Sequence, residues 1–381
     1  MTNTPDTKLY WRPDFANVVE RHRAWFEGQR TYLVTIIPDS WPSFDWDLHI
    51  DIPTPRPLAE FDFFDDRQLE EHLSFRLAQF ESFWQTKAEW GLDDDFIPVF
   101  EPRIGWAEIV APSVEGAQVH FYAQTSAMEP VVADYETFDW GRIRYSPDSP
   151  WGVIVTKINQ WSAARAHGRF LLNPKCQDAN PSDYAKACRG DDFFLDLVLN
   201  PDGVHKLMDV CTRAVVDFIQ HQRSVVGGDT LGGYGTTWQG GFWTPGTALG
   251  HVGDNVSDLV SGEMFETFLA PYLRRFLSHF DGFVFARDVT TKQIWGALRG
   301  LGNILAFAPR KMGGTDVTSE DIRTIAEATE GLPLIIEAFD AEQFLQFRQA
   351  VEETGLRAFF VVHCQNVEEG RRVLDDVRQM E

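Results

Sequence analysis

Several short apolar runs of the chain are followed at once by charged residues, and the positive ones are the first candidates for binding chemistry. If the fold brought these cations together, they would repel one another unless acidic neighbours or an anionic ligand neutralised them. One interpretation is therefore a carboxylate- or phosphate-bearing small molecule. The other is salt bridges to the acidic residues that close further runs. The cations are Arg103, Lys175, Arg287, Arg310 and Lys311, and the acidic residues are Asp39, Glu101, Asp288 and Glu337.

Acid–base chemistry needs a group that exchanges protons near neutral pH. His251 and Asp254 lie close together in HVGD, and a nearby carboxylate raises the pKa of an imidazole. We expect this pair, or Asp39 and Asp288, to supply the general acid or base. The alternative for His251 is an ordinary histidine in a surface loop.

A zinc site would have to be built from Cys176, His251 and Cys364. Their spacing matches no metal-binding motif. His363 and Cys364 are consecutive, so on a strand their side chains point to opposite faces. We expect no metal and no cofactor, keep this zinc set as an alternative, and place His363 among the ligand-binding candidates. The four cysteines form no C-x-x-C pair, which indicates reduced thiols.

Tryptophans near these runs are candidates for covering a bound molecule. Trp238 and Trp243 lie in the glycine-rich segment GGYGTTWQGGFWTPG (232–246), and Trp41 follows the first run. Glycine permits close approach of the backbone to a ligand, and an indole face covers a planar or apolar group. The alternative for the glycine-rich segment is a strand with an irregular exit loop. The chain contains no G-x-S-x-G, H-E-x-x-H or phosphate-loop motif.

The runs themselves have the composition of strands buried on both faces. Near-continuous apolar stretches without alternation are typical of parallel sheets covered by helices. Since catalytic sites of closed α/β barrels form where the strands end, the residues above would share one rim. We count eight such runs, at 31–39, 96–103, 168–176, 232–239, 282–288, 303–310, 332–339 and 357–364.

Helical periodicity fills the segments between the runs. Apolar residues recur at spacings of three and four over 68–90, 193–221, where Pro201 is expected to break the helix, and 263–280. Further helices are predicted near 318–329, opening on Thr318-x-x-Asp321, and over 341–354 and 367–380. This alternation predicts a single (β/α)8 barrel over residues 1–381. A helix at 14–27 would cap its floor, and 40–66 and 105–150 would be long rim loops. The alternative architecture is an open doubly wound sheet, but its G-x-G-x-x-G fingerprint is missing.

Composition narrows the classes of function. The 381 residues carry 34 basic and 57 acidic side chains, a formal net charge of −23, which disfavours nucleic acid and anionic membrane as partners. There is no apolar stretch of membrane-spanning length and no secretory leader pattern. We therefore expect a cytoplasmic protein that acts on a small molecule, with a homodimer left open.

The stretch DNVSDLVSGEMFETFLAPYLRRF (254–276) resembles the segment D-x-x-S-x-x-I-S-P-E-M-F-x-E-F-x-L-P-Y-L of uroporphyrinogen decarboxylase-like barrels. The similarity continues through RYSPDSPW (144–151), GRFLLNPKCQDAN (168–180), NPDGVHKLMD (200–209) and VVHCQNVEEGRRVLDD (361–376). It implies a (β/α)8 barrel of an uncharacterised branch. The decarboxylase's arginine motif after the first strand is replaced here by IPDSW (37–41), and of the His-Leu-Asp that ends the fifth strand in the branch only Asp288 remains.

The resemblance implies three functions. The favoured one is a decarboxylase or related lyase that needs no cofactor. Arg103, Arg287 and Arg310 would hold carboxylates, and Asp39 or Asp288 would donate the proton. The second is a zinc-dependent methyltransferase that takes a methyl group from a corrinoid. The third is a barrel that binds a small molecule without catalysis.

Overall fold

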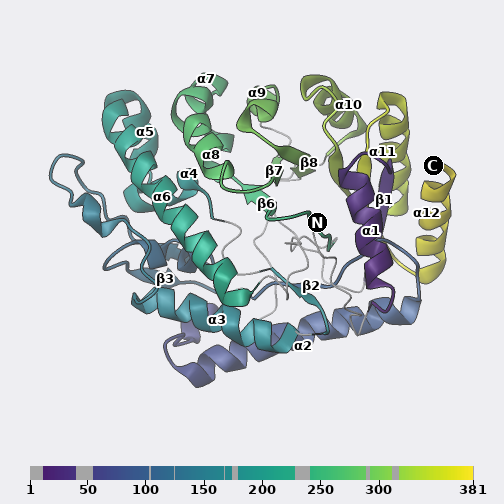
Figure 1. Ribbon diagram of the computed structural model, residues 1–381, viewed down its shortest axis with the longest axis horizontal. Helices are drawn as coiled ribbons and strands as arrows, with labels where there is room; N and C mark the ends of the chain where they lie inside the picture. The colour runs from purple at the N-terminus through teal and green to yellow at the C-terminus, as the bar shows by residue number, and fades with distance from the viewer. Residues whose placement is uncertain are drawn as a thin grey trace.

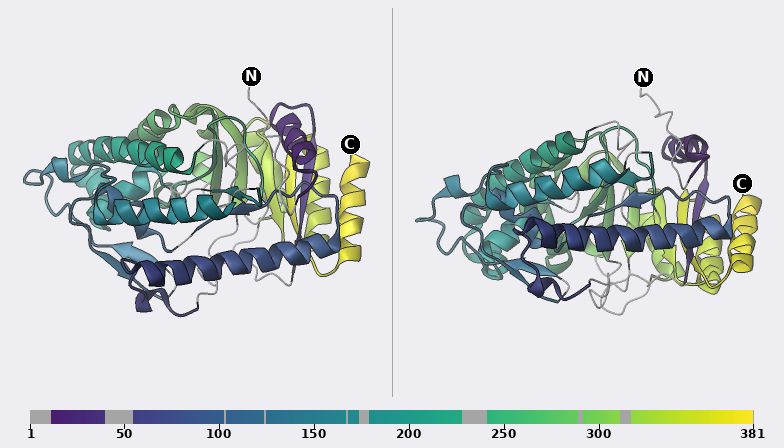
Figure 2. Two further views of the ribbon diagram at one scale, coloured as in Figure 1. Left: turned by 60° about the horizontal axis from the view of Figure 1, so that its bottom comes forward. Right: turned by 90° about the horizontal axis from the view of Figure 1, so that it is seen from below.

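The computed structural model describes residues 12–39, 55–102, 104–123, 125–166, 168–173, 179–227, 241–288, 292–310 and 317–380, with the side chains of Asp288 and Arg310 left out. Within these residues the chain is an α/β protein in which helices surround the strands (Figure 1). The long helix α2 runs along one side of the molecule (Figure 2).

Six parallel strands form the main sheet, in the order β1-β10-β9-β8-β7-β6. Five of them fall in runs that the sequence predicts as strands. The run at 232–239 lies outside the described residues, and the strand that pairs with β7 is β6, which the sequence analysis did not predict because LGHVG has too few apolar residues. The strands are β1 (Tyr32–Pro38), β6 (Leu249–Gly253), β7 (Phe283–Asp288), β8 (Ile304–Arg310), β9 (Leu334–Ala338) and β10 (Ala358–Cys364).

The two remaining predicted runs contain a second, short parallel pair, β2 (Val99–Phe100) and β5 (Leu171–Leu172). Residues just before β2 bond to the free edge of β1: the Asp95 N–H donates to the Val34 carbonyl at 2.7 Å. Just after β5, the Asn180 side chain donates to the Gly253 carbonyl of β6 at 2.5 Å. Described contacts therefore link the pair to both edges of the main sheet. A hairpin of β3 (Val119–Phe121) and β4 (Ser126–Met128) lies in the predicted rim loop 105–150.

The main sheet is covered on both faces, as its apolar runs predict. β1 and β10 are buried at every position. Alternate residues divide between two apolar clusters, with Leu33, Val284 and Phe359 in one and Phe360 in the other. Phe360 packs edge-on against Phe344 of α11 at 5.3 Å between ring centroids. The face that carries Phe360 is thus the helix-facing side of β10.

The predicted helices are present, and the local sequence signals explain their ends. Asn200 caps the helix that begins with Pro201, which confirms the predicted break. Thr318 and Asp321 form a capping box. The helices are α1 (Phe15–Phe26), α2 (Asp66–Trp90), α3 (Pro150–Ala166), α4 (Pro181–Arg189), α5 (Asp192–Leu199), α6 (Pro201–Val226), α7 (Gly262–Met264), α8 (Ala270–Leu277), α9 (Lys292–Trp295), α10 (Ser319–Ala328), α11 (Ala341–Thr354) and α12 (Val367–Met380).

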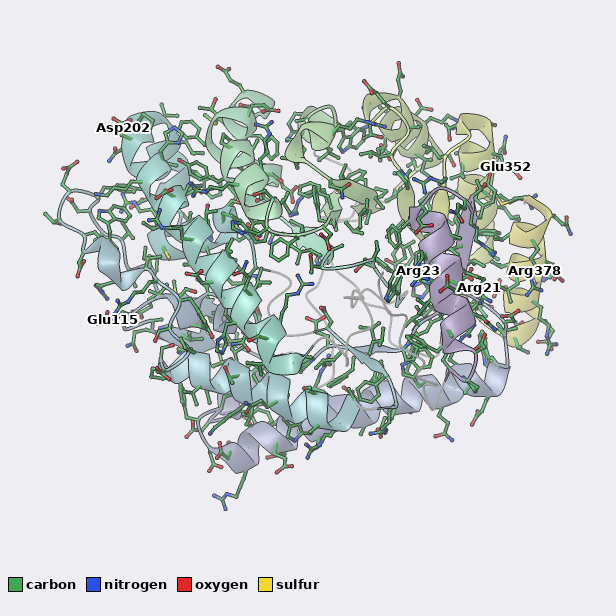
Figure 3. All side chains as sticks on the ribbon, in the orientation of Figure 1. Arg21, Arg23, Glu115, Asp202, Glu352 and Arg378 are labelled. Carbon is green, nitrogen blue, oxygen red and sulfur yellow. The ribbon has the colours of Figure 1, made fainter. Side chains whose placement is uncertain are left out.

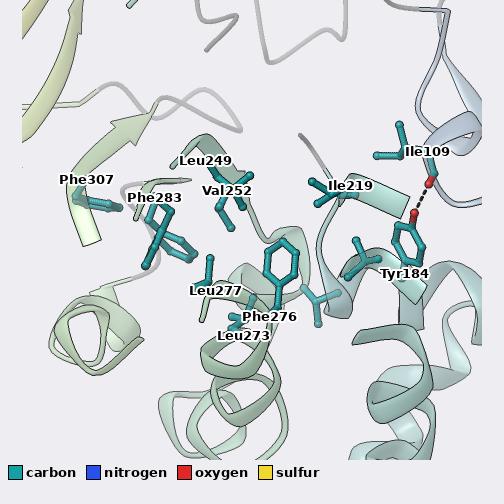
Figure 4. Packing of buried hydrophobic residues seen from close by; sticks show 14 of the residues in the cluster. Ile109, Tyr184, Ile219, Leu249, Val252, Leu273, Phe276, Leu277, Phe283 and Phe307 are labelled. Atoms are coloured by element: carbon teal, nitrogen blue, oxygen red, sulfur yellow. Dashed lines mark hydrogen bonds between the residues drawn. The ribbon is translucent and has the colours of Figure 1, made fainter. Parts of the chain in front are cut away.

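Helix α8 belongs to the segment that resembles the barrel family, and its apolar side lies in the main core. Figure 4 shows Leu273 and Phe276 of α8 in one cluster with Val252 of β6 and Phe283 of β7. A π-helical turn (Phe265–Leu269) precedes α8 where Pro271 enters the helix. This packing fixes the position of β6 and β7, whose carboxyl ends carry candidate residues.

Helix α1 packs at the amino ends of β2 and β5. Phe15 and Val18 form a cluster with Val99 and Leu171. Arg21 of α1 and Arg378 of α12, labelled in Figure 3, both contact Asp93 at 3.4 Å. No described helix is long and apolar enough to cross a membrane.

Candidate functional site

The carboxyl ends of the parallel strands lie at one edge of the sheet, and two polar groups stand there among the described residues. The first lies on β9 and β10. His363 Nε2 is 2.9 Å from Glu337 Oε1, and the side chain of His363 is 2% exposed. The Phe339 ring stacks on the imidazole at 5.5 Å. The imidazole is therefore held in one orientation by a carboxylate and a ring.

The face on which this pair lies follows from strand alternation. His363 has the parity of Phe359 and Val361, which belong to the cluster that also contains Leu33 and Val284. It is paired in register with Ile37 of β1. His363 thus points away from the helix-facing side of β10, and Asp39, which is exposed, follows two residues after Ile37.

The second group surrounds Arg287 at the end of β7. Arg287 Nη1 lies 3.3 Å from Asp258 Oδ2, and the side chain is 3% exposed. It has the parity of Phe285, over whose ring the guanidinium lies at 5.6 Å. The arginine is thus buried in an ion pair. For Arg287, one of the five predicted cations, this contact agrees with the salt-bridge interpretation. The partner, Asp258, is not one of the acidic residues predicted from the sequence.

Two further carboxyl groups complete this second group. Asp254 Oδ1 accepts hydrogen bonds from the Ser182 hydroxyl at 2.7 Å and from the Ser257 N–H at 3.3 Å. Asp183 Oδ2 accepts from the side chains of Asn180 at 2.7 Å and Asn255 at 3.2 Å. The segments that follow β5 and β6 are thereby joined by buried side chains.

Burial and mutual repulsion shift the protonation of this carboxyl pair. Burial, and then the negative charge of Asp254, raise the pKa of Asp183 to about 7, although Arg287 acts in the opposite direction. Burial also raises the pKa of Asp254. A carboxyl group that keeps its proton near neutral pH is a potential proton donor. Asp254 was expected to pair with His251. Its hydrogen bonds in the structure come from Ser182 and Ser257.

Trp243, predicted to lie beside a ligand at the strand ends, is placed elsewhere. It is 5% exposed and belongs to the cluster of Phe15 and Val18 from α1, on the amino side of the strands. The backbone N–H of Trp243 donates to His22 Nδ1 at 3.3 Å. Trp243 precedes β6, a strand that was not predicted from the sequence. The strand that Trp243 was expected to follow, at 232–239, lies outside the described residues.

The zinc alternative is not supported by its two described members. Cys364 has the parity of Phe360 and Val362, on the helix-facing side of β10, and burial raises the pKa of its thiol to about 12. His251 lies on β6, separated from β10 by three strands. Among the described residues no three histidine, cysteine or acidic side chains are grouped as metal ligands. These two residues do not fit a shared zinc ion.

Other predicted residues are placed only in part. Glu101 directly follows β2 and is half-buried, and the Asp39 N–H donates to the Cys364 carbonyl at 2.9 Å. The remaining predicted residues lie outside the described residues or described side chains. That group comprises Trp41, Arg103, Lys175, Cys176, Trp238, Lys311 and the side chains of Asp288 and Arg310.

The sequence analysis missed Asp183, Asn180 and Asp258. A signal for the first two was present, because Asn180-Pro181-Ser182-Asp183 has an N-cap residue followed by proline, the typical start of a helix. Asp258 lies in a short 3-10 helix (Asn255–Leu259) inside the family-like segment. Its partner Arg287 is distant in sequence, so no spacing predicts that ion pair.

Comparison with known proteins supports the fold. No family model and no curated protein sequence matches the chain. Among solved structures, a methyltransferase from Methanosarcina mazei superposes with a TM-score of 0.56 at 10% sequence identity. The match covers 95% of this chain and 99% of the other. The two proteins therefore share a fold along nearly their whole lengths.

Proposed function

We propose that this chain is an enzyme of a methyltransferase-like (β/α)8 barrel that transfers a methyl group between small molecules at the carboxyl ends of its strands. The observation that carries the proposal is the fold shared with a methyltransferase over 95% of the chain, combined with a buried imidazole at the edge where such barrels hold their sites. Closure of the barrel is part of the proposal, supported by the contacts from β1 to Asp95 and from Asn180 to β6. A single domain over 1–381 is supported by the same match.

Methyl transfer to a heteroatom requires that the acceptor lose a proton. In the proposed reaction His363 takes this proton, the acceptor's electron pair forms the new bond to the methyl carbon, and the pair of the old bond stays with the donor. Glu337, at 2.9 Å, stabilises the imidazolium that results. No step is assigned to zinc, because His251 and Cys364 do not fit it.

Transfer of a 13C-labelled methyl group tests this proposal. The purified chain is incubated with labelled methylcobalamin, or with labelled S- and N-methyl compounds, and a panel of thiols and amines, with and without added zinc. We expect a labelled product by NMR, and a rate about 100-fold or more lower for His363→Gln. Absence of a labelled product from every pair contradicts the proposal and favours a binding barrel without catalysis.

Decarboxylation remains the second candidate because of one observation. The buried Arg287 lies beside a carboxyl group whose pKa is raised to about 7, which is the combination of cation and proton donor that a decarboxylase needs. In this version Asp183, not Asp39 or Asp288, protonates the carbanion. Release of labelled carbon dioxide from a panel of 13C-carboxylates, lost in Asp183→Asn, would favour it over methyl transfer.

A further inference from the structure

Two buried side chains next to the end of β6 have polar atoms without a hydrogen-bond partner among the residues that the structure describes. Nε and Nη2 of Arg287 and Oδ2 of Asp254 are buried without a hydrogen-bond partner. The two side chains are almost completely buried, at 3% and 0% exposure. Buried donors and acceptors without a partner are rare, and each of them destabilises a fold. Their retention in one place indicates a ligand that bonds to both.

Gly253 brings the guanidinium close to the backbone at this place. A Cβ atom built on Gly253 would be crowded against His251 Nε2 at 3.1 Å and would lie 3.6 Å from Arg287 Nη2. Because glycine has no side chain, Arg287 and His251 lie directly against the backbone of this residue. Asp254 is the next residue, so its carboxyl group belongs to the same wall of the group. The Gly253 carbonyl is held by Asn180, which fixes this wall against the start of α4.

The charges of the group determine which ligand it takes. Three carboxyl groups, Asp183, Asp254 and Asp258, surround one cation, Arg287. A simple carboxylate would add negative charge to a buried group that is already acidic, and a simple amine would leave the guanidinium donors unsatisfied. A molecule that carries an ammonium group and a carboxylate on the same carbon meets both requirements without a net change of charge.

We propose that Arg287, Asp254 and Gly253 form a subsite for an amino acid or amino-acid-like zwitterion, whose carboxylate binds Nε and Nη2 of Arg287 and whose ammonium group donates to Oδ2 of Asp254. This inference rests on the proposed function, since it names the class of molecule that donates or accepts the methyl group. Planar bidentate recognition of carboxylate is the geometry that arginine provides.

Binding to the full chain, without a methyl donor, tests the subsite. The twenty standard amino acids are measured by thermal shift and calorimetry, with propionate and ethylamine as probes that carry only one of the two charges. We expect at least one amino acid to bind, and both single-charge probes to bind at least tenfold more weakly. No binding by any amino acid at about 10 mM, well above a millimolar Kd, or equal binding by propionate, overturns the proposal.

Three variants test the named atoms while preserving the fold. Asp254→Asn keeps an acceptor for Ser182 and Ser257 but replaces Oδ2 by an amide donor, which repels ammonium. Arg287→Lys keeps the charge beside Asp258 but loses the planar guanidinium. Gly253→Ala places a methyl group against His251 and Arg287 while keeping every charge. Each is expected to weaken amino-acid binding at least tenfold, whereas the exposed Asp202→Asn on α6 leaves it unchanged. Unchanged binding in Asp254→Asn overturns the assignment.

The two proposals fail separately. If an amino acid binds as described but no methyl group is transferred, the subsite stands and the reaction class is wrong. If methyl transfer is observed and no amino acid binds, the reaction stands and the substrate class is wrong.

Discussion

The protonation of Asp183 links the candidate site to the stability of the whole chain. Its pKa is raised to about 7 by burial and by Asp254, whereas an unfolded aspartate titrates near pH 3.9. Between about pH 4 and 7 the folded state therefore holds a proton that the unfolded state has lost. In this window the free energy of unfolding decreases as pH rises, by up to about 1.4 kcal/mol per pH unit.

Asp183→Asn is expected to remove this dependence, because an amide does not titrate. Urea unfolding at pH 5 and pH 7 should show a smaller loss of stability in the variant than in the parent chain. Asp202→Asn, at an exposed position labelled in Figure 3, provides the control and should retain the parent's dependence. Equal pH dependence in all three proteins would show that Asp183 is ionised in the fold.

At the scale of elements, side chains take the place of a neighbouring strand along the free edge of β1. They accept hydrogen bonds from the backbone N–H groups of this strand. Asp94 and Asp95 accept the N–H groups of Ile36 and Val34, each at 2.8 Å. Lys87 of α2 is buried and lies 2.5 Å from Asp94. Asp94→Ala would leave both an unsatisfied strand N–H and a buried ammonium group.

We expect Asp94→Ala to lower the free energy of unfolding by about 3–5 kcal/mol, the usual effect of removing one partner of a buried ion pair. The matched control is Asp93→Ala in the same segment, whose side chain is 66% exposed and whose ion pairs contribute at most about 1 kcal/mol. Chemical denaturation compares the two. Similar losses for both variants would mean that the segment does not stabilise β1 as described.

The capping box of α10 gives a smaller effect at the same scale. Thr318→Ala removes the hydroxyl that accepts the Asp321 N–H at 3.1 Å, and we expect a loss of about 1 kcal/mol. Ser319→Ala, one residue inside the helix, should change stability much less. Thermal unfolding of the two variants checks this. Thr318 was also predicted from the sequence, because a capping box lies within four consecutive residues and can be recognised without knowledge of the fold.

For the whole molecule, local signals predicted the architecture and non-local contacts decided the site. Apolar runs and helical spacing identified five strands of the main sheet, and Pro201 identified a helix boundary. β6 was not predicted because Gly250 and His251 interrupt its apolar pattern, so the position of Trp243 before this strand was not predicted either. The partners of Arg287 come from two other segments, so no pattern along the chain reveals that this cation is buried in an ion pair.

The central claim is that the buried His363, and not the neighbouring thiol of Cys364, supports methyl transfer at the strand ends. The most direct measurement is the rate of labelled methyl transfer in His363→Gln and Cys364→Ala, compared with the parent chain. The account predicts a decrease of about 100-fold or more for the first variant and a rate within a few-fold of the parent for the second. A zinc-dependent rate that is abolished by Cys364→Ala and retained in His363→Gln would contradict it.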